Sequence, residues 1–222
     1  MDLRQIQASD SLEDIARIGV VFFREVVNGA TAQKLRQRFD AVTLELRQAI
    51  GKRPITELDS VKRTRNLFHC LGIDPTRSRP SSERLLRRVV QDRPLPKVSK
   101  LVDLVNLASL VHQFPIGVYD WDRIVPPVLV RIGRPEESYL GLNGETVPLE
   151  GKIALVDGEG FFGNPTQDSP RTLTKPGTVR ALVLVWASAE TPKAGMEEAL
   201  KEVIALGREF CEARAGEWGI LG

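Results

Sequence analysis

The stretch "KLVDLVNLASLVHQFPIGVYD" (residues 100–120) predicts a buried helix that runs directly into a buried strand. Its first half is apolar on nearly every side, which is typical of a helix inside a core rather than on a surface. Asp103 and Asn106 interrupt this pattern one turn apart, and Ser109 follows at the same spacing. Burying a carboxylate or an amide without a hydrogen-bond partner is costly. We therefore expect these side chains to face either a neighbouring loop or a ligand.

The segments around this stretch predict an α+β fold, because helices dominate the first half of the chain and strands the second. A helix at 80–91 is marked by Pro80 at its start and Pro94 beyond its end. Residues 152–157 and 178–187 are near-continuous apolar runs, which are typical of central strands. We expect a central mixed or antiparallel sheet packed by helices. Further expected elements are strands at 16–27, 116–120, 128–132 and 138–142, and helices at 31–52, 57–71 and 191–214.

The length of 222 residues fits one globular domain. We expect residues 1–54 to contribute a strand and a helix packed on the same domain as residues 55–222, which end in the C-terminal helix. The N-terminus lacks the apolar segment of a signal peptide, and the apolar runs are too short to cross a bilayer. We therefore expect a cytoplasmic protein without a membrane partner. Two lone cysteines and two lone histidines show no metal-ligand spacing, so we expect no metal and no cofactor.

Basic side chains are concentrated between residues 62 and 100, where eleven Lys and Arg face three acids. This segment, here called the basic band, carries a net charge of +8, which leaves −6 for the rest of a chain of net charge +2. Such a band is either a footprint for a polyanion or an ordinary solvated face. The candidate RNA-binding residues are Lys62, Arg63, Arg65, Arg77, Arg79, Arg84, Arg87 and Arg88.

A long segment without a predicted element, residues 158–177, is a second candidate region, because loops of this length are often functional. It offers Asp168, Arg171 and Thr172, and an arginine can hold a carboxylate or a phosphate with two parallel hydrogen bonds. Asp120 ends the strand at 116–120. A turn contact between Asp168 and Arg171 is an alternative account of that pair.

An ordered set of segments resembles the B3/B4 domain of the phenylalanyl-tRNA synthetase β subunit, especially its free-standing relatives. The matching segments span roughly residues 55 to 190 and are "LGIDPTRSRPSSERLLRRV", "KLVDLVNLASL", "FPIGVYD", "VLVRIG", the "EE" at 136–137 and "NPTQDSPRT". The resemblance implies an α+β domain whose pocket hydrolyses tyrosine wrongly attached to phenylalanine tRNA. It also implies that the 3′ end of the tRNA reaches that pocket.

Carried over residue by residue, the synthetase pattern V-D-x-T-N falls on residues 102–106, and P-x-H-x-x-D falls on 115–120. The threonine position is Val105 and the histidine position is Gly117. These departures remove groups that bind a tyrosyl hydroxyl or position water, so we expect a pocket of similar shape with another ligand. Gly117 either enlarges the pocket or is required by the turn after Pro115. The expected pocket residues are Asp103, Asn106, Pro115, Gly117, Asp120, Asp168, Arg171 and Thr172.

Three functions follow as alternatives. The first is a free-standing aminoacyl-tRNA module that binds tRNA and hydrolyses mischarged aminoacyl-tRNA in trans, without being a complete ligase. The second is a non-catalytic binder of a small amino-acid-like ligand, and the third is a structural domain with a vestigial pocket. The sequence leaves the amino acid, the tRNA, the catalytic residues and the oligomeric state open. Within the pocket, we expect Asn106 to contact the ligand and Asp103 to tie the helix start to a neighbouring loop.

Overall fold

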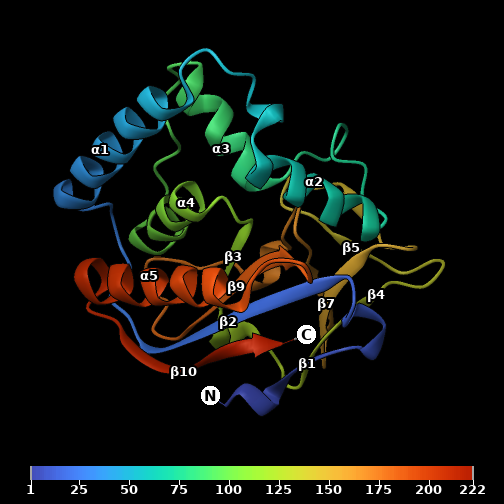
Figure 1. Ribbon diagram of the computed structural model, residues 1–222. Coiled ribbons are helices and arrows are strands. Elements are labelled where there is room, and N and C mark those ends of the chain that lie inside the picture. The colour runs from blue at the N-terminus through green and yellow to red at the C-terminus, as the bar shows by residue number, and fades with distance from the viewer. Residues whose placement is uncertain (1, 222) are drawn as a thin grey trace.

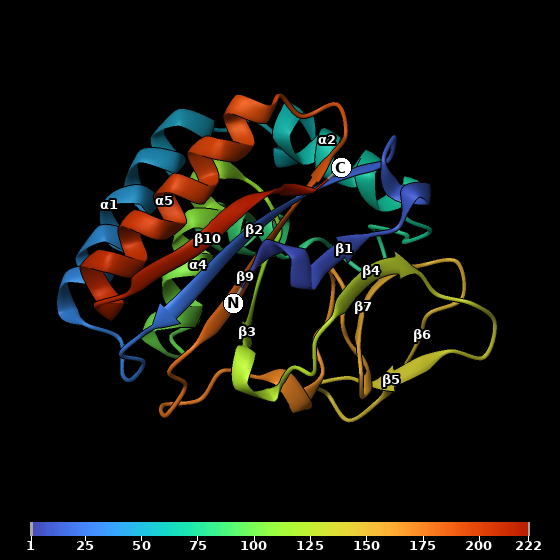
Figure 2. The ribbon, with the colours of Figure 1, turned by 90° about the horizontal axis from the view of Figure 1, so that it is seen from below.

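The computed structural model describes residues 2–221 and has the predicted α+β fold, built in layers (Figure 1). An antiparallel sheet of strand order β10-β2-β9-β3 lies between a layer of helices and a second, mixed sheet of order β1-β4-β7-β8. Seen from below, the helices cover one side of the first sheet and the second sheet lies beside it (Figure 2). A separate hairpin, β5–β6, extends the second sheet's side of the molecule.

The helices are α1 (Gln33–Ile50), α2 (Asp59–Cys70), α3 (Ser81–Val90), α4 (Lys100–His112) and α5 (Lys193–Cys211). The strands of the first sheet are β2 (Ala16–Glu25), β3 (Ile116–Asp120), β9 (Ala181–Ser188) and β10 (Arg214–Leu221). Those of the second are β1 (Ile6–Ala8), β4 (Val128–Ile132), β7 (Ile153–Asp157) and β8 (Gly160–Gly163). The hairpin consists of β5 (Ser138–Leu140) and β6 (Thr146–Pro148), and a 3₁₀ helix, η5, covers Pro170–Thr172.

The central strands of the first sheet, β2 and β9, are buried on both faces, which explains why they read as continuous apolar runs. Along β2, Val21 and Phe23 pack against the helices, while the alternate residues Val20 and Phe22 pack against the second sheet. Successive side chains of a strand point to opposite faces, so each core receives every second residue. The N-terminal strand and helix therefore share these cores with the rest of the chain.

The C-terminal helix is shorter than predicted. The last helix was expected to reach residue 214, but α5 ends at Cys211 and a strand, β10, follows it. Glu212 adopts a left-handed conformation with φ of 50°, which reverses the chain so that β10 can pair with β2. The sequence of β10 contains charged residues and glycines, so it gives little indication of a strand. The strand is recognisable only through its pairing with β2.

The expected loop at 158–177 also contains structure that the sequence did not predict. β8 pairs with β7 in a tight hairpin, and η5 begins after Ser169, whose side chain accepts a hydrogen bond from the Arg171 amide. The remaining turn, residues 164–168, is organised by Asn164, whose side-chain oxygen accepts hydrogen bonds from the backbone of Thr166 and Gln167. This turn lies close to α3, because Arg84 donates to the Thr166 carbonyl at 3.1 Å.

Candidate functional site

A cavity of about 600 Å³ opens between α3, α4, β3 and the turn at 164–168, a volume typical of small-ligand sites. Asn106 from α4, Gly117 from β3 and Asp168 from the turn all line it, so the structure brings together three of the predicted pocket residues. Much of the wall is apolar and comes from Val98, Val102, Val105, Ile116, Val118, Leu142, Leu173 and Trp186. The rest of the wall is largely polar and includes Ser81, Arg84, Asn106, Asn143, Asn164, Thr166, Gln167, Asp168 and Thr174.

Asp168 is held in this cavity by Tyr119, whose hydroxyl donates a hydrogen bond of 2.7 Å to the Asp168 Oδ1. Tyr119 is fully buried, and its ring meets Phe162 edge to face with centroids 5.3 Å apart. Burial raises the pKa of Asp168 to about 6, although the Tyr119 hydrogen bond and the Arg84 charge both lower it. Burial likewise raises the pKa of Tyr119 well above its usual value, so the phenol remains a donor. The Asp168 carboxylate is therefore held in one orientation, and burial makes its ionisation less favourable than in water.

Two glycines make room for the Tyr119–Asp168 pair. A Cβ atom built on Gly117 would lie 2.6 Å from the Tyr119 hydroxyl oxygen. A Cβ built on Gly163 would lie 2.9 Å from the Asp168 Oδ1 and 3.0 Å from the same hydroxyl. Both separations are far inside van der Waals contact, so any side chain at either position displaces the pair.

This geometry corrects both interpretations of Gly117. The missing side chain does not simply enlarge the cavity, because the Tyr119 phenol occupies the adjacent space. The turn does not require glycine through a left-handed backbone either, since Gly117 is absent from the positive-φ residues within the described chain. Glycine is needed here for the close approach of the residue two positions further along the same strand face.

Asn106 and Arg84 complete the polar part of the cavity. The structure records no side-chain hydrogen bond for Asn106 within residues 2–221, so its amide can both donate to and accept from a ligand. Arg84 is the one basic side chain that lines the cavity, and no ion pair within the described residues joins it to Asp168. Desolvation lowers the pKa of Arg84, with the Asp168 charge acting against this effect.

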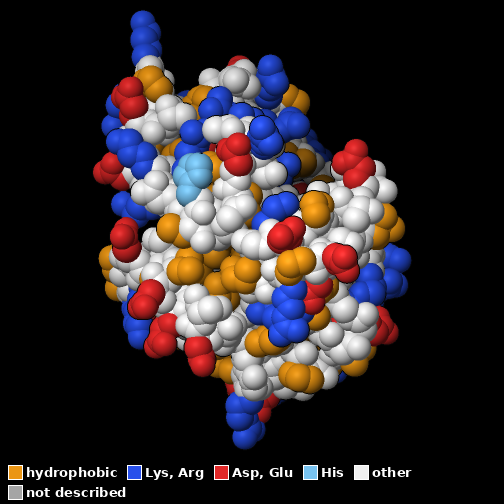
Figure 3. Space-filling view, turned by 90° about the vertical axis from the view of Figure 1, so that its right-hand side faces the viewer, with side chains coloured by type: hydrophobic (Ala, Val, Ile, Leu, Met, Phe, Trp, Pro, Cys, Tyr) orange, Lys and Arg blue, Asp and Glu red, His pale blue; other side chains and the backbone are white. Residues whose placement is uncertain are grey.

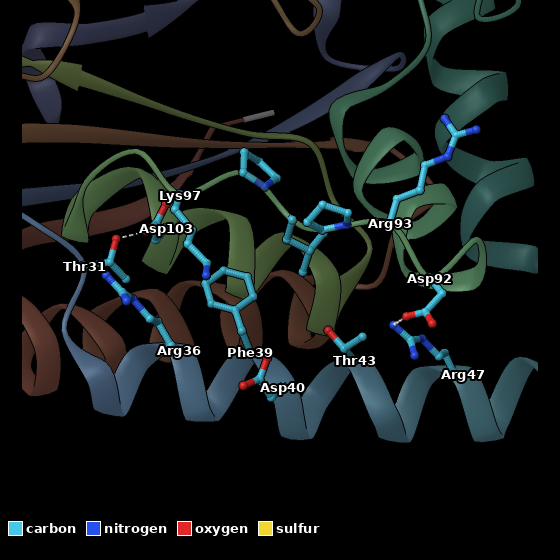
Figure 4. Close-up of a pocket in the computed structure, with 13 residues that line it drawn as sticks. Thr31, Arg36, Phe39, Asp40, Thr43, Arg47, Asp92, Arg93, Lys97 and Asp103 are labelled. Atoms are coloured by element: carbon cyan, nitrogen blue, oxygen red, sulfur yellow. Dashed lines mark hydrogen bonds and ion pairs between the residues drawn. The ribbon is translucent and has the colours of Figure 1, made fainter.

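Asp103 lies on a neighbouring face of α4, at a second cavity of about 400 Å³ between α1 and the segment that joins α3 to α4 (Figure 4). Its carboxylate accepts hydrogen bonds from the Thr31 hydroxyl and from the Val98 amide, the latter at 3.0 Å. These contacts fasten the start of α4 to two loops. Asp103 was expected in the pocket, but it does not line the 600 Å³ cavity. Its expected contact with a neighbouring loop is present, as the hydrogen bond from the Val98 amide.

The polar side chains of α4 diverge because of helix geometry. Residues three apart in a helix are rotated by about 60° relative to each other, since each residue turns about 100°. Asp103 thus faces α1, Asn106 faces the 600 Å³ cavity, and Ser109 donates to the Phe114 carbonyl at 2.6 Å. The stripe seen in the sequence serves three separate purposes.

Four other predicted pocket residues do not line the 600 Å³ cavity. Arg171 pairs with the buried Asp157 at 2.8 Å and with Glu159 at 3.0 Å, and so ties η5 to the β7–β8 hairpin rather than contacting Asp168. Asp120 accepts a hydrogen bond of 2.7 Å from Thr178. Pro115 acts through its backbone, because its carbonyl accepts a hydrogen bond from the Trp186 amide. Thr172 is fully buried.

The basic band is divided between free and paired cations. Glu83, which is only 1% exposed, is surrounded by Arg65, Arg79 and Arg87 at 2.7, 3.4 and 3.1 Å. Burial raises the pKa of Glu83, and the hydrogen bonds from Arg65 and Arg87 outweigh burial, so the net shift is downward. Three of the predicted RNA-binding arginines thus hold a buried carboxylate.

The other cations of the band are available to a partner. Arg63 and Arg88 are exposed, and Arg88 donates only to the Pro94 carbonyl. Lys62 and Arg77 lie 3.8 and 3.7 Å from exposed aspartates on their own segments, which are weak pairs in water. Lys and Arg side chains gather in the upper part of the face shown in Figure 3, the height at which α3 and the start of α2 lie in Figure 1.

Within residues 2–221, no cluster of His, Cys, Asp and Glu has the arrangement of a metal site. None of the helices described for this chain combines the length and apolarity needed to span a membrane.

Among the site residues missed in the sequence are Tyr119, which donates to Asp168, and Asn143, Asn164 and Gln167, which line the cavity. Tyr119 had a signal, because it shares a strand face with Gly117. The other three lie on turns whose approach to α4 depends on the whole fold. Arg84 was assigned to RNA binding alone, although it also lines the cavity.

Comparison with known proteins agrees with this architecture. Residues 63–163, a span of 101 of the 222 residues, match the family model of the B3/4 domain. A segment of 62 residues is 39% identical to the phenylalanine–tRNA ligase β subunit of Ralstonia nicotianae, which covers 28% of this chain and 8% of that protein. The fold is similar to that of an N-terminal fragment of the phenylalanyl-tRNA synthetase β subunit from Pyrococcus horikoshii, with a TM-score of 0.50 and 14% identity. That similarity covers 95% of this chain and 50% of the fragment. Residues 63–163 thus match the B3/4 domain family, and a segment of the chain is similar to the β subunit of phenylalanyl-tRNA synthetase.

Proposed function

We propose that this chain binds the aminoacyl end of a tRNA and hydrolyses the ester bond of a mischarged aminoacyl-tRNA. The amino acid would enter the 600 Å³ cavity while the RNA backbone lies on the basic band. One observation carries this proposal: Arg84 belongs to both features, since it lines the cavity and sits on the exposed side of α3. A small-molecule site that opens directly onto a cationic surface suits a small group attached to a polyanion.

The proposed reaction is ester hydrolysis. Water adds to the carbonyl carbon, the bond to the tRNA 3′ oxygen breaks, and this oxygen leaves as a hydroxyl after taking up a proton. The Asn106 amide can donate a hydrogen bond to the oxyanion that develops on the carbonyl oxygen. Asp168, on another wall of the cavity, can bind the amino acid or a water molecule.

The amino acid is expected to differ from tyrosine. The resemblance places a threonine at Val105 and a histidine at Gly117, and the structure puts an aliphatic side chain and the Tyr119 phenol at these places. With Trp186 and Ile116 completing the wall, the cavity favours a side chain that needs few hydrogen bonds. The aligned segment covers only a small part of the synthetase subunit, and ligase activity is not part of the proposal.

Charge reversal on the basic band tests RNA binding. The variant Arg63→Glu/Arg84→Glu/Arg88→Glu leaves the Glu83 cluster intact, because none of these arginines pairs with Glu83 within the described residues. The matched control is Lys193→Glu/Lys201→Glu/Arg208→Glu on the exposed side of α5, which changes the net charge equally. We expect tRNA affinity to fall at least tenfold in the first variant and little in the control.

Salt dependence provides the second measurement. Each phosphate contact contributes about −0.7 to −0.9 to the slope of log affinity against log salt, so the band variant should show a shallower slope than the control. Equal affinity and slope in both variants would contradict the assignment of the basic band to tRNA.

A second function, binding of a free amino acid without turnover, is favoured by the two opposite charges of the cavity. Asp168 and Arg84 are the charged side chains that line it, which matches the ammonium and carboxylate of a zwitterion. Thermal stabilisation by free amino acids, with no response to tRNA, would support this function over the first.

A further inference from the structure

Among the described residues 2–221, Asp168 is the one acidic residue that lines the 600 Å³ cavity. Its Oδ1 is occupied by the Tyr119 hydroxyl, whereas its Oδ2 has no hydrogen-bond donor recorded among residues 2–221. An ionised carboxylate can accept several hydrogen bonds, so this group retains unused acceptor capacity. Polar side chains also line the cavity, but the amides of Asn143 and Gln167 donate to Glu145 and to Asn143 rather than to Asp168.

The carboxylate is also fixed in place. Tyr119 is immobilised by complete burial and by its packing against Phe162. Its hydroxyl already fills the space beside Gly117 and Gly163. The Asp168 backbone is held as well, because its carbonyl accepts a hydrogen bond of 3.0 Å from the Leu142 amide. An oriented carboxylate in a poorly solvated cavity loses much of its hydration, and a cationic partner would compensate this loss.

We propose that Asp168 binds the protonated α-amino group of the ligand and that Tyr119 is its positioning residue, so that the site accepts only amino acids with a free amine. This inference rests on the proposed function for the identity of the ligand. The side chain of the amino acid then points along the aliphatic wall. Arg84 faces the anionic end, which is the carboxylate of a free amino acid or a phosphate of a tRNA.

Acetylation of the amine provides the test, because it removes the charge and adds bulk at the bound atom. The probes are valyl-, threonyl- and tyrosyl-tRNA, joined through a non-hydrolysable 3′ amide, each with a free or an N-acetylated amine, together with the uncharged tRNAs. The methyl esters of the same three amino acids and their N-acetyl derivatives form a second set without RNA.

For the parent protein, we expect at least one free-amine probe to bind ten times or more tightly than its N-acetyl form. Asp168→Asn should abolish this difference while binding uncharged tRNA as the parent does. The matched control, Asp59→Asn, removes an exposed carboxylate on α2 and should behave as the parent. Equal affinity for free and acetylated probes in the parent would overturn the inference.

The two sets of probes separate this inference from the proposed function. Amine selectivity for the methyl esters without any tRNA binding would support the role of Asp168 and overturn the tRNA proposal. Binding of tRNA without amine selectivity in either set would support the tRNA proposal and overturn the role of Asp168. Absence of binding in both sets would overturn both.

The role of Tyr119 is tested by a pH profile, which a purely structural residue would not shift. The groups facing Asp168 are Tyr119 from β3, Arg84 from α3 and Tyr139 from β5, and the last two stay in one protonation state near neutral pH. Affinity of the parent for the methyl esters should fall as the pH drops through about 6, because Asp168 becomes protonated. Tyr119→Phe removes the hydrogen bond that lowers the pKa of Asp168, so the midpoint should move to higher pH. An unchanged midpoint would contradict the positioning role.

Discussion

At the scale of single residues, the position of the Asp168 carboxylate depends on two glycines that have no side chain. Gly117 and Gly163 leave space for the Tyr119 hydroxyl and the Asp168 carboxylate, which together present one oriented acceptor to the cavity. The sequence identified Gly117 and Asp168 as site candidates, but it could not reveal that Tyr119 joins them. That relation depends on the approach of the turn at 164–168 to β3, which no local pattern encodes.

Replacement of Gly117 by alanine should destabilise the protein by about 1 to 3 kcal/mol, the usual cost of overpacking a core. The new methyl group would lie 2.6 Å from the Tyr119 hydroxyl and would break its hydrogen bond to Asp168. Gly195→Ala is the control, because nothing lies near its Cβ position and alanine favours the helix α5. Urea unfolding of both variants measures the difference, and a Gly117→Ala protein as stable as the parent would contradict the close approach.

Asp168→Asn should make the protein more stable at pH 8 and leave its stability unchanged at pH 4. The pKa of Asp168 is raised from 3.8 to about 6, so the folded state binds the proton more tightly than the unfolded state. The parent therefore loses stability as the pH rises from about 4 to above 6, and the amide variant does not. The gain at pH 8 is up to about 3 kcal/mol, since one pKa unit corresponds to about 1.4 kcal/mol. Thermal unfolding at both pH values tests this, and a less stable variant at pH 8 would refute it.

At the scale of elements, α3 and α4 each combine a structural face with a functional face. On α4, Asp103 anchors the helix start while Asn106 faces the cavity. On α3, the buried Glu83 pairs with three partly exposed arginines, while Arg84 and Arg88 are exposed. The sequence predicted all five helices, and the helix ends that it predicted lie within three residues of the observed ends, because apolar periodicity and helix-end residues mark them. It could not predict which charges become buried, since burial depends on the neighbouring helix.

The two polar residues of α4 should respond differently to alanine. Asp103→Ala leaves the Val98 amide and the Thr31 hydroxyl without their acceptor, so we expect a loss of about 1 to 3 kcal/mol in unfolding free energy. Asn106→Ala breaks no side-chain hydrogen bond recorded within residues 2–221, so it should weaken binding of aminoacyl probes with little effect on stability. Thermal unfolding and probe titration of both variants decide the matter, and the reverse pattern would exchange the two roles.

Glu83→Gln should destabilise the protein by about 3 kcal/mol at pH 7, because three guanidinium groups lose their common counter-charge. The folded-state pKa of Glu83 is lowered, so its stabilisation is complete above the ordinary value of 4.5 and is lost as the pH falls below it. The difference between variant and parent should therefore shrink at pH 3.5. Asp59→Asn, at an exposed position of α2, should change stability little at either pH. A Glu83→Gln protein of parental stability at pH 7 would show that the cluster contributes nothing.

At the scale of the whole molecule, the cavity exists because a helical layer and a second sheet meet at one edge of the first sheet. β3 is the edge strand of the β10-β2-β9-β3 sheet, and its exposed side receives the turn at 164–168 and the helix α3. The sequence predicted the fold class and, through an ordered set of segments, the family. The sequence predicted Arg171 and Asp120 in the cavity because both belong to segments that resemble the synthetase domain. In the structure, Arg171 pairs with the buried Asp157, and Asp120 accepts a hydrogen bond from Thr178.

The most direct test of the account measures deacylation of a panel of correctly charged and mischarged tRNAs by the parent protein. We expect at least one mischarged tRNA to be hydrolysed well above its spontaneous rate, while the same tRNA with its correct amino acid is spared. Asn106→Ala and Arg63→Glu/Arg84→Glu/Arg88→Glu should each lose this activity, the first through the cavity and the second through RNA binding. Spontaneous rates for every tRNA in the panel, or a rate that neither variant changes, would contradict the central claim that cavity and basic band act on one ligand.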